Sequence, residues 1–270
     1  MQQIRCAFIA RFWRHPVRRQ SGFIYYDERR QRFGIDWQQS LSIVVGELLL
    51  QEILQARSYI KGRLLDVGCG TRPYALIYDP LVEMSVGTEV TYSPHGLQNA
   101  DIICPAERLP FADASFDTVL CTEVLEHTRD PSAVIQEIRR ILRPGGYLLL
   151  SVPFIYPIHE APYDHWRFTS YGLRLLCTDA GLEVIYVHPK GGIGATLIVL
   201  WANLAVRGVN AVSKLLRQSI PLRDRRTIRW LLSFPQRIYL WLRNSTAVVG
   251  IDKAIGDFLT PGYFLVARRP

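Results

Sequence analysis

The feature that most constrains this chain is an apolar run with one acidic residue that ends in two glycines, over residues 64–74. The apolar residues around Asp66 predict a buried strand, and Gly68 and Gly70 predict a sharp turn directly after it. Because glycine has no Cβ, the backbone of such a turn can approach a ligand closely, and the carboxylate can accept hydrogen bonds from a ligand amine. Pro73 stands where a dinucleotide fingerprint needs its third glycine, which weakens that interpretation and leaves an ordinary tight turn as an alternative.

Strand-like and helix-like segments alternate along the chain. A helical spacing of apolar residues over 37–59 precedes the first strand, and Asp130 and Thr169 are residue types that commonly begin helices. The predicted strands lie at 63–67, within 82–91, and at 101–104, 117–121, 147–152, 182–187 and 261–269. This alternation predicts an α/β domain, whose ligands bind at the carboxyl ends of the strands.

A second acidic residue ends the next strand. Glu89 follows Gly70 by 19 positions, which is about where an open α/β sheet holds the ribose of a nucleotide. A carboxylate can accept hydrogen bonds from both ribose hydroxyls at once. The alternative is a surface glutamate at a strand end.

Four motifs then occur in one order: an Asp-x-Gly-x-Gly turn at 66–70, the acidic strand end at Glu89, a Glu-x-Leu-Pro-Phe…Ser-Phe-Asp segment at 107–117, and the block at 123–153. Their combination resembles the class I S-adenosylmethionine-dependent methyltransferases, in particular the type 11 methyltransferase-like family, over residues 60–188 and 261–269. The resemblance implies an α/β, Rossmann-like fold with a seven-stranded, mostly parallel sheet and helices on both faces. It also implies S-adenosyl-L-methionine as the cofactor.

The resemblance further implies which residues hold that cofactor. The family commonly has an Asp where Pro105 stands, so the adenine contact is expected from the backbone of Ala106 and Glu107. Thr122 and Glu123 follow the fourth strand and are expected to line the cofactor. The whole expected set is Asp66, Gly68, Cys69, Gly70, Glu89, Ala106, Glu107, Thr122 and Glu123.

Three histidines near the expected mouth, His127, His159 and His165, are the candidate catalytic residues, as acid, base or substrate contact. The last two belong to residues 153–169, a segment rich in aromatic residues and proline that is expected to wall off the second substrate. A capping or packing role for His127 and a rigid structural loop are the alternatives. No metal site is expected, because Pro162 separates His159 from His165 and no secure helical His-x-x-x-His spacing is present.

The formal net charge of +8 is distributed unevenly. Residues 1–20 carry +5 and residues 190–250 carry +9, which leaves −6 for the remainder. Such an imbalance indicates an anionic partner, either a membrane surface or a nucleic acid. The basic residues are interleaved with bulky apolar ones, and no Asn/Asp-Pro-Pro-Tyr type of base-stacking motif is found, so a membrane surface is favoured and nucleic acid is disfavoured.

These patterns divide the chain into a basic N-terminal arm (1–35), a methyltransferase core (36–189), an apolar and basic helical insertion (190–258) and a final core strand (259–270). Polar residues of the insertion lie on one face of a predicted helix: Asn203, Arg207, Asn210, Lys214 and Arg217. A basic group follows them: Arg223, Arg225, Arg226 and Arg229. Pro235 is then expected to kink or break the second helix.

The insertion between the last two strands has four interpretations: an interfacial membrane element, a lid over an apolar substrate, a homodimer contact, or packing against the core. No uncharged run of 18 apolar residues occurs, so no membrane span is expected. Five cysteines, an odd number without a Cys-x-x-Cys pair, indicate buried thiols in a reducing compartment. We therefore expect a cytoplasmic protein that associates with the cytoplasmic face of a membrane.

The predicted function is methyl transfer from S-adenosylmethionine to a small-molecule, lipid or glycan-linked acceptor. In this chemistry the cofactor supplies the activated methyl group, and the protein mainly positions and desolvates the reactants. The alternative is a non-catalytic S-adenosylmethionine-binding scaffold at a membrane surface, which Arg72 in the glycine turn and Pro105 at the adenine position leave open.

Overall fold

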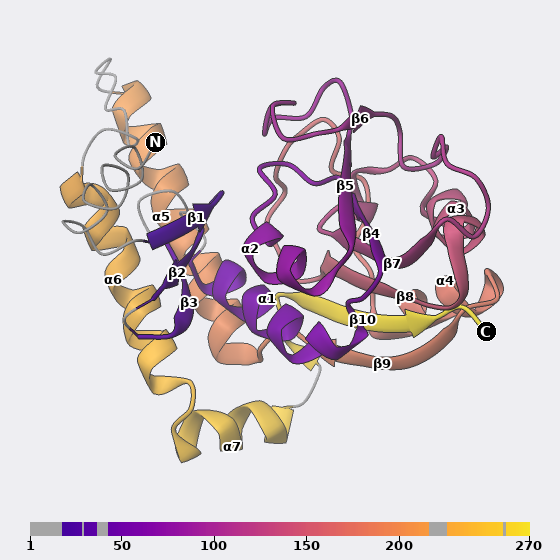
Figure 1. The fold of residues 1–270 in the computed structure, drawn as a ribbon. Helices are drawn as coiled ribbons and strands as arrows, with labels where there is room; N and C mark the ends of the chain where they lie inside the picture. The colour runs from indigo at the N-terminus through magenta and orange to yellow at the C-terminus, as the bar shows by residue number, and fades with distance from the viewer. Residues whose placement is uncertain (1–17, 29, 37–42, 216–225, 256–257) are drawn as a thin grey trace, which may run out of the picture.

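The computed structural model describes residues 18–28, 30–36, 43–215, 226–255 and 258–270 (Figure 1). A seven-stranded sheet in the order β6-β5-β4-β7-β8-β10-β9 forms the core of this part of the chain. Its strands are β4 (Arg63–Val67), β5 (Met84–Glu89), β6 (Ile102–Ile103), β7 (Phe116–Thr122), β8 (Leu142–Pro153), β9 (Glu183–Pro189) and β10 (Gly262–Arg268). The helices of the core are α1 (Ile43–Gln55), η1 (Ala56–Tyr59), α2 (Ala75–Tyr78), η2 (Asp79–Leu81), η3 (Leu125–His127), α3 (Pro131–Ile141) and α4 (Ser170–Asp179).

The order of the strands reverses next to β4. This strand pairs in parallel with β5 on one side and with β7 on the other, so the chain leaves β4 toward one edge and later returns to its opposite side. Open α/β sheets bind ligands at such a switch point. Only β10 runs against its neighbours, between β8 and β9. The predicted fold, a seven-stranded, mostly parallel sheet, is confirmed.

Side chains alternate between the two faces of the central strands, and each face is covered by helices (Figure 1). Leu65 and Val119 belong to the buried cluster that α3 and α4 cover. Their neighbours Leu64 and Leu120 point to the other face and join the cluster that includes α1. Burial on both faces fixes the register of these strands, because a shift of one residue would exchange the two faces.

Side-chain caps begin two of the helices where the sequence predicted them. The carboxylate of Asp130 accepts a hydrogen bond from the Ala133 amide at 3.1 Å, and Pro131 opens α3. The hydroxyl of Thr169 accepts from the Gly172 amide at 3.1 Å at the start of α4. Each cap also marks the end of a loop that carries residues of the site.

Residues 18–35 form a three-stranded antiparallel sheet, where the sequence analysis placed part of a basic arm; residues 1–17 lie outside the described residues. The strands are β1 (Arg18–Ser21), β2 (Ile24–Asp27) and β3 (Arg32–Ile35). Ile24 and Ile35 are buried in the cluster that includes α1. These two apolar contacts explain why the segment packs on the core instead of extending from it.

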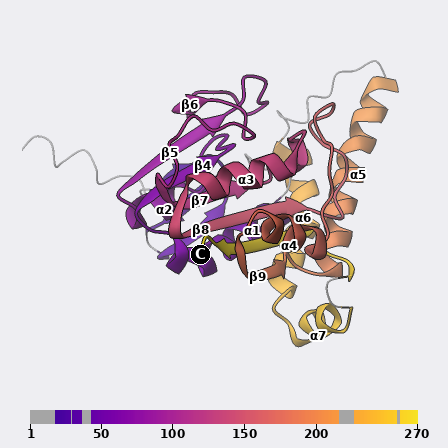
Figure 2. The same ribbon diagram turned by 90° about the vertical axis from the view of Figure 1, so that its right-hand side faces the viewer.

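The described residues between β9 and β10 are mainly helical. Figures 1 and 2 show their long helices standing beside the sheet rather than over one of its faces. The three helices are α5 (Ile193–Leu215), α6 (Arg226–Leu242) and α7 (Thr246–Ile255). Pro235 lies inside α6, so the predicted break does not occur there. Arg217, Arg223 and Arg225 lie outside the described residues.

The insertion is attached to the core through α1. Val44 and Leu48 of α1 form a buried apolar cluster with Ala195 and Val199 of α5. In addition, the Val44 amide donates a hydrogen bond to the Gln236 side chain of α6 at 3.4 Å. The first turns of α5 therefore have one face that is fixed against the core.

We expect Leu48→Ala to lower the free energy of unfolding by about 2 kcal/mol, because it removes a buried side chain between α1 and α5. Leu197→Ala, at a position of α5 that is 59% exposed, is the matched control and should change stability by less than about 0.5 kcal/mol. Urea unfolding at pH 7 measures both. Equal effects of the two substitutions would contradict the packing described here.

Candidate active site

A cavity of about 240 Å³ opens at the carboxyl ends of β4 and β5, at the topological switch point. Its wall comes from the ends of these strands and from the loops that follow β5, β6, β7 and β8. The lining residues are Val67, Gly68, Thr88, Glu89, Val90, Tyr92, Ser93, Pro94, His95, Cys104, Ala106, Glu107, Val124, His127, Thr128, Glu160, Ala161 and Tyr163. Five of the predicted site residues are therefore brought together: Gly68, Glu89, Ala106, Glu107 and His127.

Glu89 joins the two strand ends that form the floor of the cavity. Its Oε2 accepts a hydrogen bond from the Gly70 amide at 2.9 Å, and its Oε1 accepts from the Val90 amide at 2.9 Å. Both bonds hold the carboxylate in one orientation at the cavity wall. Because each carboxylate oxygen has a second lone pair, Glu89 can still accept hydrogen bonds from the two hydroxyls of a ribose.

The glycine turn has the geometry that the sequence predicted. Gly68 has a φ of 64°, and a Cβ there would lie 2.5 Å from a methyl carbon of Val124. Gly70 has a φ of 51°. The thiol of Cys69 is buried rather than in the cavity wall, and burial raises its pKa to about 12. Cys69 therefore contributes to the turn through its backbone, whose amide donates to the Thr88 carbonyl at 2.9 Å.

Asp66 lies behind the turn rather than in the cavity wall. It is 2% exposed, and its Oδ2 accepts a hydrogen bond from the Tyr78 hydroxyl at 3.0 Å. Burial raises the pKa of Asp66 to about 7, although the Tyr78 hydroxyl acts in the opposite direction. The sequence identified this carboxylate as a ligand contact, whereas its partner in the structure is a tyrosine that the sequence analysis did not single out.

Arg72 in the glycine turn is occupied by structural contacts. Its guanidinium pairs with the carboxylate of Asp101, which also accepts a hydrogen bond from the Gly87 amide at 2.8 Å. The backbone carbonyl of Arg72 accepts from the Ser21 hydroxyl. The arginine therefore ties the turn to β5 and to β1 and does not fill the cavity.

At the adenine side, Ala106 and Glu107 line the cavity as predicted, next to Cys104. The Glu107 carboxylate accepts a hydrogen bond from the Arg129 amide at 3.1 Å, which connects this loop to the end of η3. Thr122 and Glu123 do not line the cavity. Glu123 has a φ of 55°, and its Oε1 contacts the Ser151 hydroxyl at 2.7 Å and the buried ammonium of Lys190.

The three candidate histidines lie in different environments. His127 lines the cavity, and its Nδ1 is 3.1 Å from the Tyr163 carbonyl oxygen. The ring of His159 lies 4.8 Å from the ring of His127 at an angle of 78°, just outside the cavity lining. His165 has an exposed side chain, and its backbone amide donates to the Glu126 carbonyl at 2.8 Å.

Two loops meet over the cavity in a way that sequence spacing did not reveal. The rings of Tyr92 and Tyr163 stack with centroids 4.5 Å apart, and His95 Nε2 lies 3.2 Å from Glu160 Oε1. Hydrogen bonding to Glu160 raises the pKa of His95 above its ordinary value. Below this raised pKa the imidazole carries a positive charge and forms an ion pair with the Glu160 carboxylate. Segment 153–169 therefore covers the cavity, as its aromatic composition indicated.

The strand order and the position of the cavity define the class I methyltransferase fold. Two solved structures share this fold across most of their lengths. The [4+2]-cyclase SpnF has a TM-score of 0.52 and 20% identity, and the match covers 94% of this chain and 89% of the other. A putative sarcosine dimethylglycine methyltransferase from Galdieria sulphuraria has a TM-score of 0.51 and 16% identity, and the match covers 90% of this chain and 91% of the other. At such identities the comparison concerns the fold alone.

Residues 65–150 match the type 11 family model that is described as a methyltransferase domain. Residues 65–150 therefore form a class I S-adenosylmethionine-dependent methyltransferase domain of the type 11 family, and for this stretch the recognition from sequence motifs and the cofactor prediction are confirmed.

Curated relatives match over part of their length. The human thiol S-methyltransferase TMT1B is 33% identical over 120 residues, which are 40% of this chain and 47% of the relative. The O-methyltransferase rstn1 of Aspergillus nomiae is 32% identical over 153 residues, 50% of this chain and 64% of the relative. The ubiquinone biosynthesis O-methyltransferase of Xanthomonas oryzae is 32% identical over 115 residues, 37% and 47%. The chain thus spans about half to just under two thirds of the length of these relatives.

We expect Glu89→Gln to weaken binding of S-adenosylhomocysteine by about 1–3 kcal/mol, because the substitution removes a charged hydrogen-bond acceptor from the cavity wall. Isothermal titration calorimetry measures the change. Glu83→Gln, at an exposed position just before the other end of β5, is the control and should leave the affinity unchanged. An unchanged affinity in Glu89→Gln would remove this carboxylate from the cofactor site.

Asp66 gives a prediction for stability and pH. Its pKa is raised in the folded state, so the folded protein keeps a proton that the unfolded chain loses, and stability falls as pH rises from about 4 to about 7. Asp66→Asn should abolish this contribution, which amounts to about 4 kcal/mol over that range. Chemical unfolding at several pH values measures it, with the exposed Asp179→Asn at the end of α4 as control. Parallel pH profiles for wild type and Asp66→Asn would contradict the assignment.

Proposed function

We propose that the protein transfers the methyl group of S-adenosylmethionine to a hydroxyl or thiol group of an apolar small molecule, which it takes from an anionic membrane surface. The observation that carries the proposal is an exposed apolar helix, α5, that contacts the loop covering the cofactor cavity. The relatives include O-methyltransferases and a thiol S-methyltransferase, which supports oxygen or sulfur as the acceptor atom.

In this reaction the acceptor oxygen or sulfur attacks the methyl carbon, the bond from that carbon to the sulfonium sulfur breaks, and S-adenosylhomocysteine leaves. The acceptor proton passes to a base or to water. The chain supplies orientation and exclusion of water, through the Glu89 contacts on one side and the stacked Tyr92 and Tyr163 on the other. Of the three candidate histidines, His127 is the one on the cavity wall, so we assign it as the acceptor contact; His159 lies behind it and His165 faces outward.

The outer face of the insertion supports contact with lipid. Leu197, Trp201 and Leu204 follow one another at steps of four and three along α5, and Leu204 is 70% exposed. Among the α6 side chains that the structure describes, the exposed large apolar ones are Phe234, Ile238, Trp241 and Leu242. Aromatic and aliphatic side chains next to basic residues suit the boundary between headgroups and acyl chains.

Segment Ile193–Ala211 of α5 is also long and apolar enough to cross a membrane, on length and composition alone. However, Ala195 and Val199 on its inner face are packed against α1. A helix that is fixed in this way along one side presents only its other side, so we favour an interfacial position over a span. We expect the cytoplasmic leaflet as the anionic surface, because its lipids carry the negative charge.

The insertion is linked directly to the loop over the cavity. Arg207 of α5 donates a hydrogen bond from its Nη2 to the backbone carbonyl of Ile158 at 2.7 Å. Ile158 is itself exposed and precedes His159 and Glu160, which lie at the acceptor side. This contact places the surface of α5 next to the loop that covers the cavity, where an apolar acceptor would enter.

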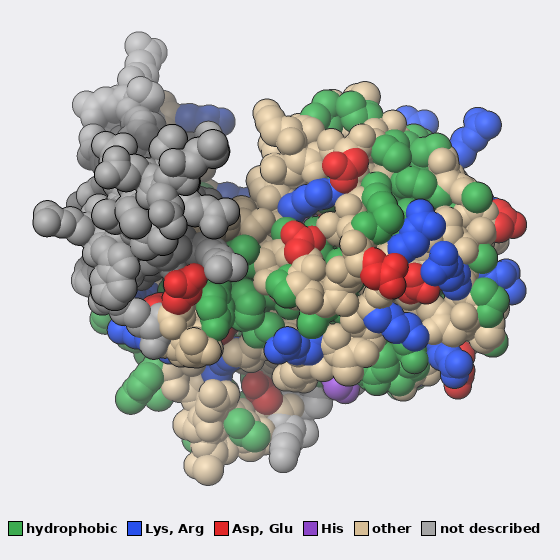
Figure 3. Space-filling model, viewed as in Figure 1, with side chains coloured by type: hydrophobic (Ala, Val, Ile, Leu, Met, Phe, Trp, Pro, Cys, Tyr) green, Lys and Arg blue, Asp and Glu red, His purple; other side chains and the backbone are tan. Residues whose placement is uncertain are grey.

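The charge distribution favours lipid over nucleic acid. On the face of the core that Figure 3 shows, Lys and Arg side chains are interspersed with Asp and Glu and form no continuous stripe. Nucleic acid binding usually requires such a stripe along the backbone path. The excess positive charge lies instead in segments 1–20 and 190–250.

The direct test uses the purified full chain, S-adenosylmethionine with a labelled methyl group, and isolated cytoplasmic membranes. We expect label in a product that organic solvent extracts, and less label with Glu89→Gln when the cofactor concentration is below the wild-type Kd. Cofactor binding without any labelled product would favour the non-catalytic scaffold. Label in the soluble fraction alone would show that the acceptor does not come from the membrane.

A double substitution tests the membrane surface. We expect Trp201→Glu with Leu204→Glu to weaken binding to vesicles of phosphatidylglycerol and phosphatidylcholine at least tenfold, because two apolar side chains no longer enter the interface. Tyr171→Glu, at the exposed start of α4, should have no effect. Co-sedimentation measures binding, and retained affinity for S-adenosylhomocysteine shows that each variant is folded. Equal loss in both variants would mean that charge alone, and not the α5 surface, governs binding.

A further inference from the structure

A buried carboxylate without a hydrogen-bond partner among the described residues lies beside the cavity. Glu126, in η3, is 0% exposed, and neither of its carboxyl oxygens has a hydrogen-bond partner among the described residues. Nearly all buried polar groups in folded proteins have such partners. A carboxylate in this position becomes neutral either by taking a proton or by binding a cation.

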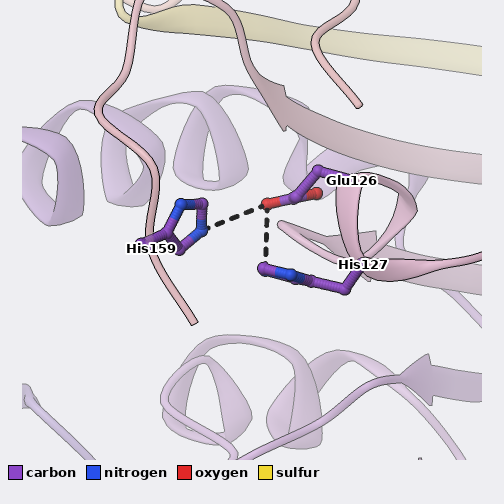
Figure 4. Close-up of side chains that lie close together, drawn as sticks. All are labelled: Glu126, His127 and His159. Carbon is purple, nitrogen blue, oxygen red and sulfur yellow. Dashed lines mark ion pairs between the residues drawn. The ribbon is translucent and has the colours of Figure 1, made fainter. Parts of the chain in front are cut away.

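Two imidazole rings are aimed at this carboxylate (Figure 4). Glu126 Oε1 lies 3.6 Å from His127 Nε2 and 3.8 Å from His159 Nε2, and the three atoms lie within 4.8 Å of one another. These distances are too long for direct hydrogen bonds. Metal–ligand bonds of about 2.0–2.2 Å place neighbouring ligand atoms roughly 3–3.5 Å apart, so atoms that now lie up to 4.8 Å apart would approach one another by about 1 Å to share one ion.

The opposite nitrogens of the two rings face oxygen atoms. His127 Nδ1 is 3.1 Å from the Tyr163 carbonyl, which can only accept, so Nδ1 carries the hydrogen and Nε2 has a free lone pair. His159 Nδ1 lies 3.3 Å from the carboxylate of Asp164, although it is not aligned as a hydrogen bond there. A ligating histidine typically has its second nitrogen next to a carbonyl or carboxylate in this way.

The nearby cations already have other partners. Lys190 pairs with Glu123, and Arg167 pairs with both oxygens of Asp164. Three atoms that each offer an electron pair therefore converge on one point. Lys190 and Arg167, which are paired elsewhere, form no ion pair with Glu126 among the described contacts. A fourth potential ligand atom, the carboxylate oxygen Oε2 of Glu160, lies 3.8 Å from His127 Nε2.

We propose that Glu126, His127 and His159 form a binding site for a divalent transition-metal ion of the Mn²⁺, Fe²⁺, Co²⁺ or Zn²⁺ class, with Glu160 close enough to become a fourth ligand. Two imidazole nitrogens together with carboxylate oxygens suit these ions better than Mg²⁺ or Ca²⁺, which prefer oxygen ligands throughout. The sequence analysis considered only His159 and His165 as a metal pair, whereas the residues that converge come from η3 and from segment 153–169.

The site borders the cavity, because His127 and Glu160 also line it. For catalysis, the inference rests on the proposed function: an ion held there would bind the acceptor oxygen or sulfur and lower the pKa of its proton, so that a weak base suffices. Binding of the ion itself requires no acceptor and no turnover. The two proposals can therefore fail separately.

The experiment titrates Mn²⁺ into the tag-free full chain after treatment with a chelator, and follows free Mn²⁺ by electron paramagnetic resonance. We expect one saturable site per chain in the wild type. Glu126→Gln and His159→Gln should each weaken the site at least tenfold. A parallel titration with Co²⁺ should give visible d–d absorption bands in the wild type that His159→Gln alters.

His188→Gln is the matched control, since His188 also lies next to a carboxylate, Glu52, at 3.4 Å, but outside this cluster. It should bind Mn²⁺ as the wild type does. S-adenosylhomocysteine binding shows whether each variant is folded. Absence of a saturable site in folded wild type, or equal affinities in wild type, Glu126→Gln and His159→Gln, would overturn the inference, whatever the result of the methyl-transfer assay.

Discussion

The hydrogen bond between the Glu89 carboxylate and the Gly70 amide holds the site together. It joins the end of β5 to the turn after β4, and it forms only because parallel strands bring their carboxyl ends to the same edge of the sheet. The glycine conformation at the turn, the backbone contact from Cys69 to Thr88 and the Arg72–Asp101 pair all support the same junction. The cavity wall is therefore largely backbone and short, fixed side chains, which need little reorganisation when a nucleoside binds.

Much of this arrangement could be predicted from the sequence, because it depends on local patterns. The apolar runs predicted the strands, and the capping residues predicted where α3 and α4 begin. The positions of Gly68, Glu89 and Ala106 after predicted strands indicated that these residues are neighbours in space. Side-chain direction was less predictable. Glu123 follows β7 as expected, but its positive φ accompanies a side chain that contacts Ser151 and Lys190, and Lys190 is 67 positions away. Likewise, neither the Tyr92–Tyr163 stack nor the Glu126–His159 approach leaves a spacing signal, since each joins loops that have no periodicity.

The position of the insertion follows from the sheet. β9 and β10 are antiparallel neighbours, so the end of β9 lies close to the start of β10. A longer connection between these two points can therefore extend away from the sheet without changing how the strands pair. Lengthening such a connection costs little entropy for each added residue. In this chain the added segment is not a loose loop, because α5 and α6 pack on α1. An apolar surface is thus held at a fixed place relative to the cavity, which a flexible connection could not achieve.

Segment 153–169 connects the separate parts of the acceptor side. It supplies His159 and Glu160 to the cluster around Glu126, Tyr163 to the stack over the cavity, and the Ile158 carbonyl to Arg207 of α5. Its position is fixed at its far end by backbone hydrogen bonds from His165 and Trp166 to the Glu126 carbonyl. Because one short loop makes all these contacts, a shift of α5 at a membrane surface would act on the same backbone that orients the acceptor-side ligands. On the proposed function, selection of the acceptor and access to lipid would then depend on one structural unit, and this unit also contacts the loop after β5 through the Tyr92–Tyr163 stack and the His95–Glu160 pair.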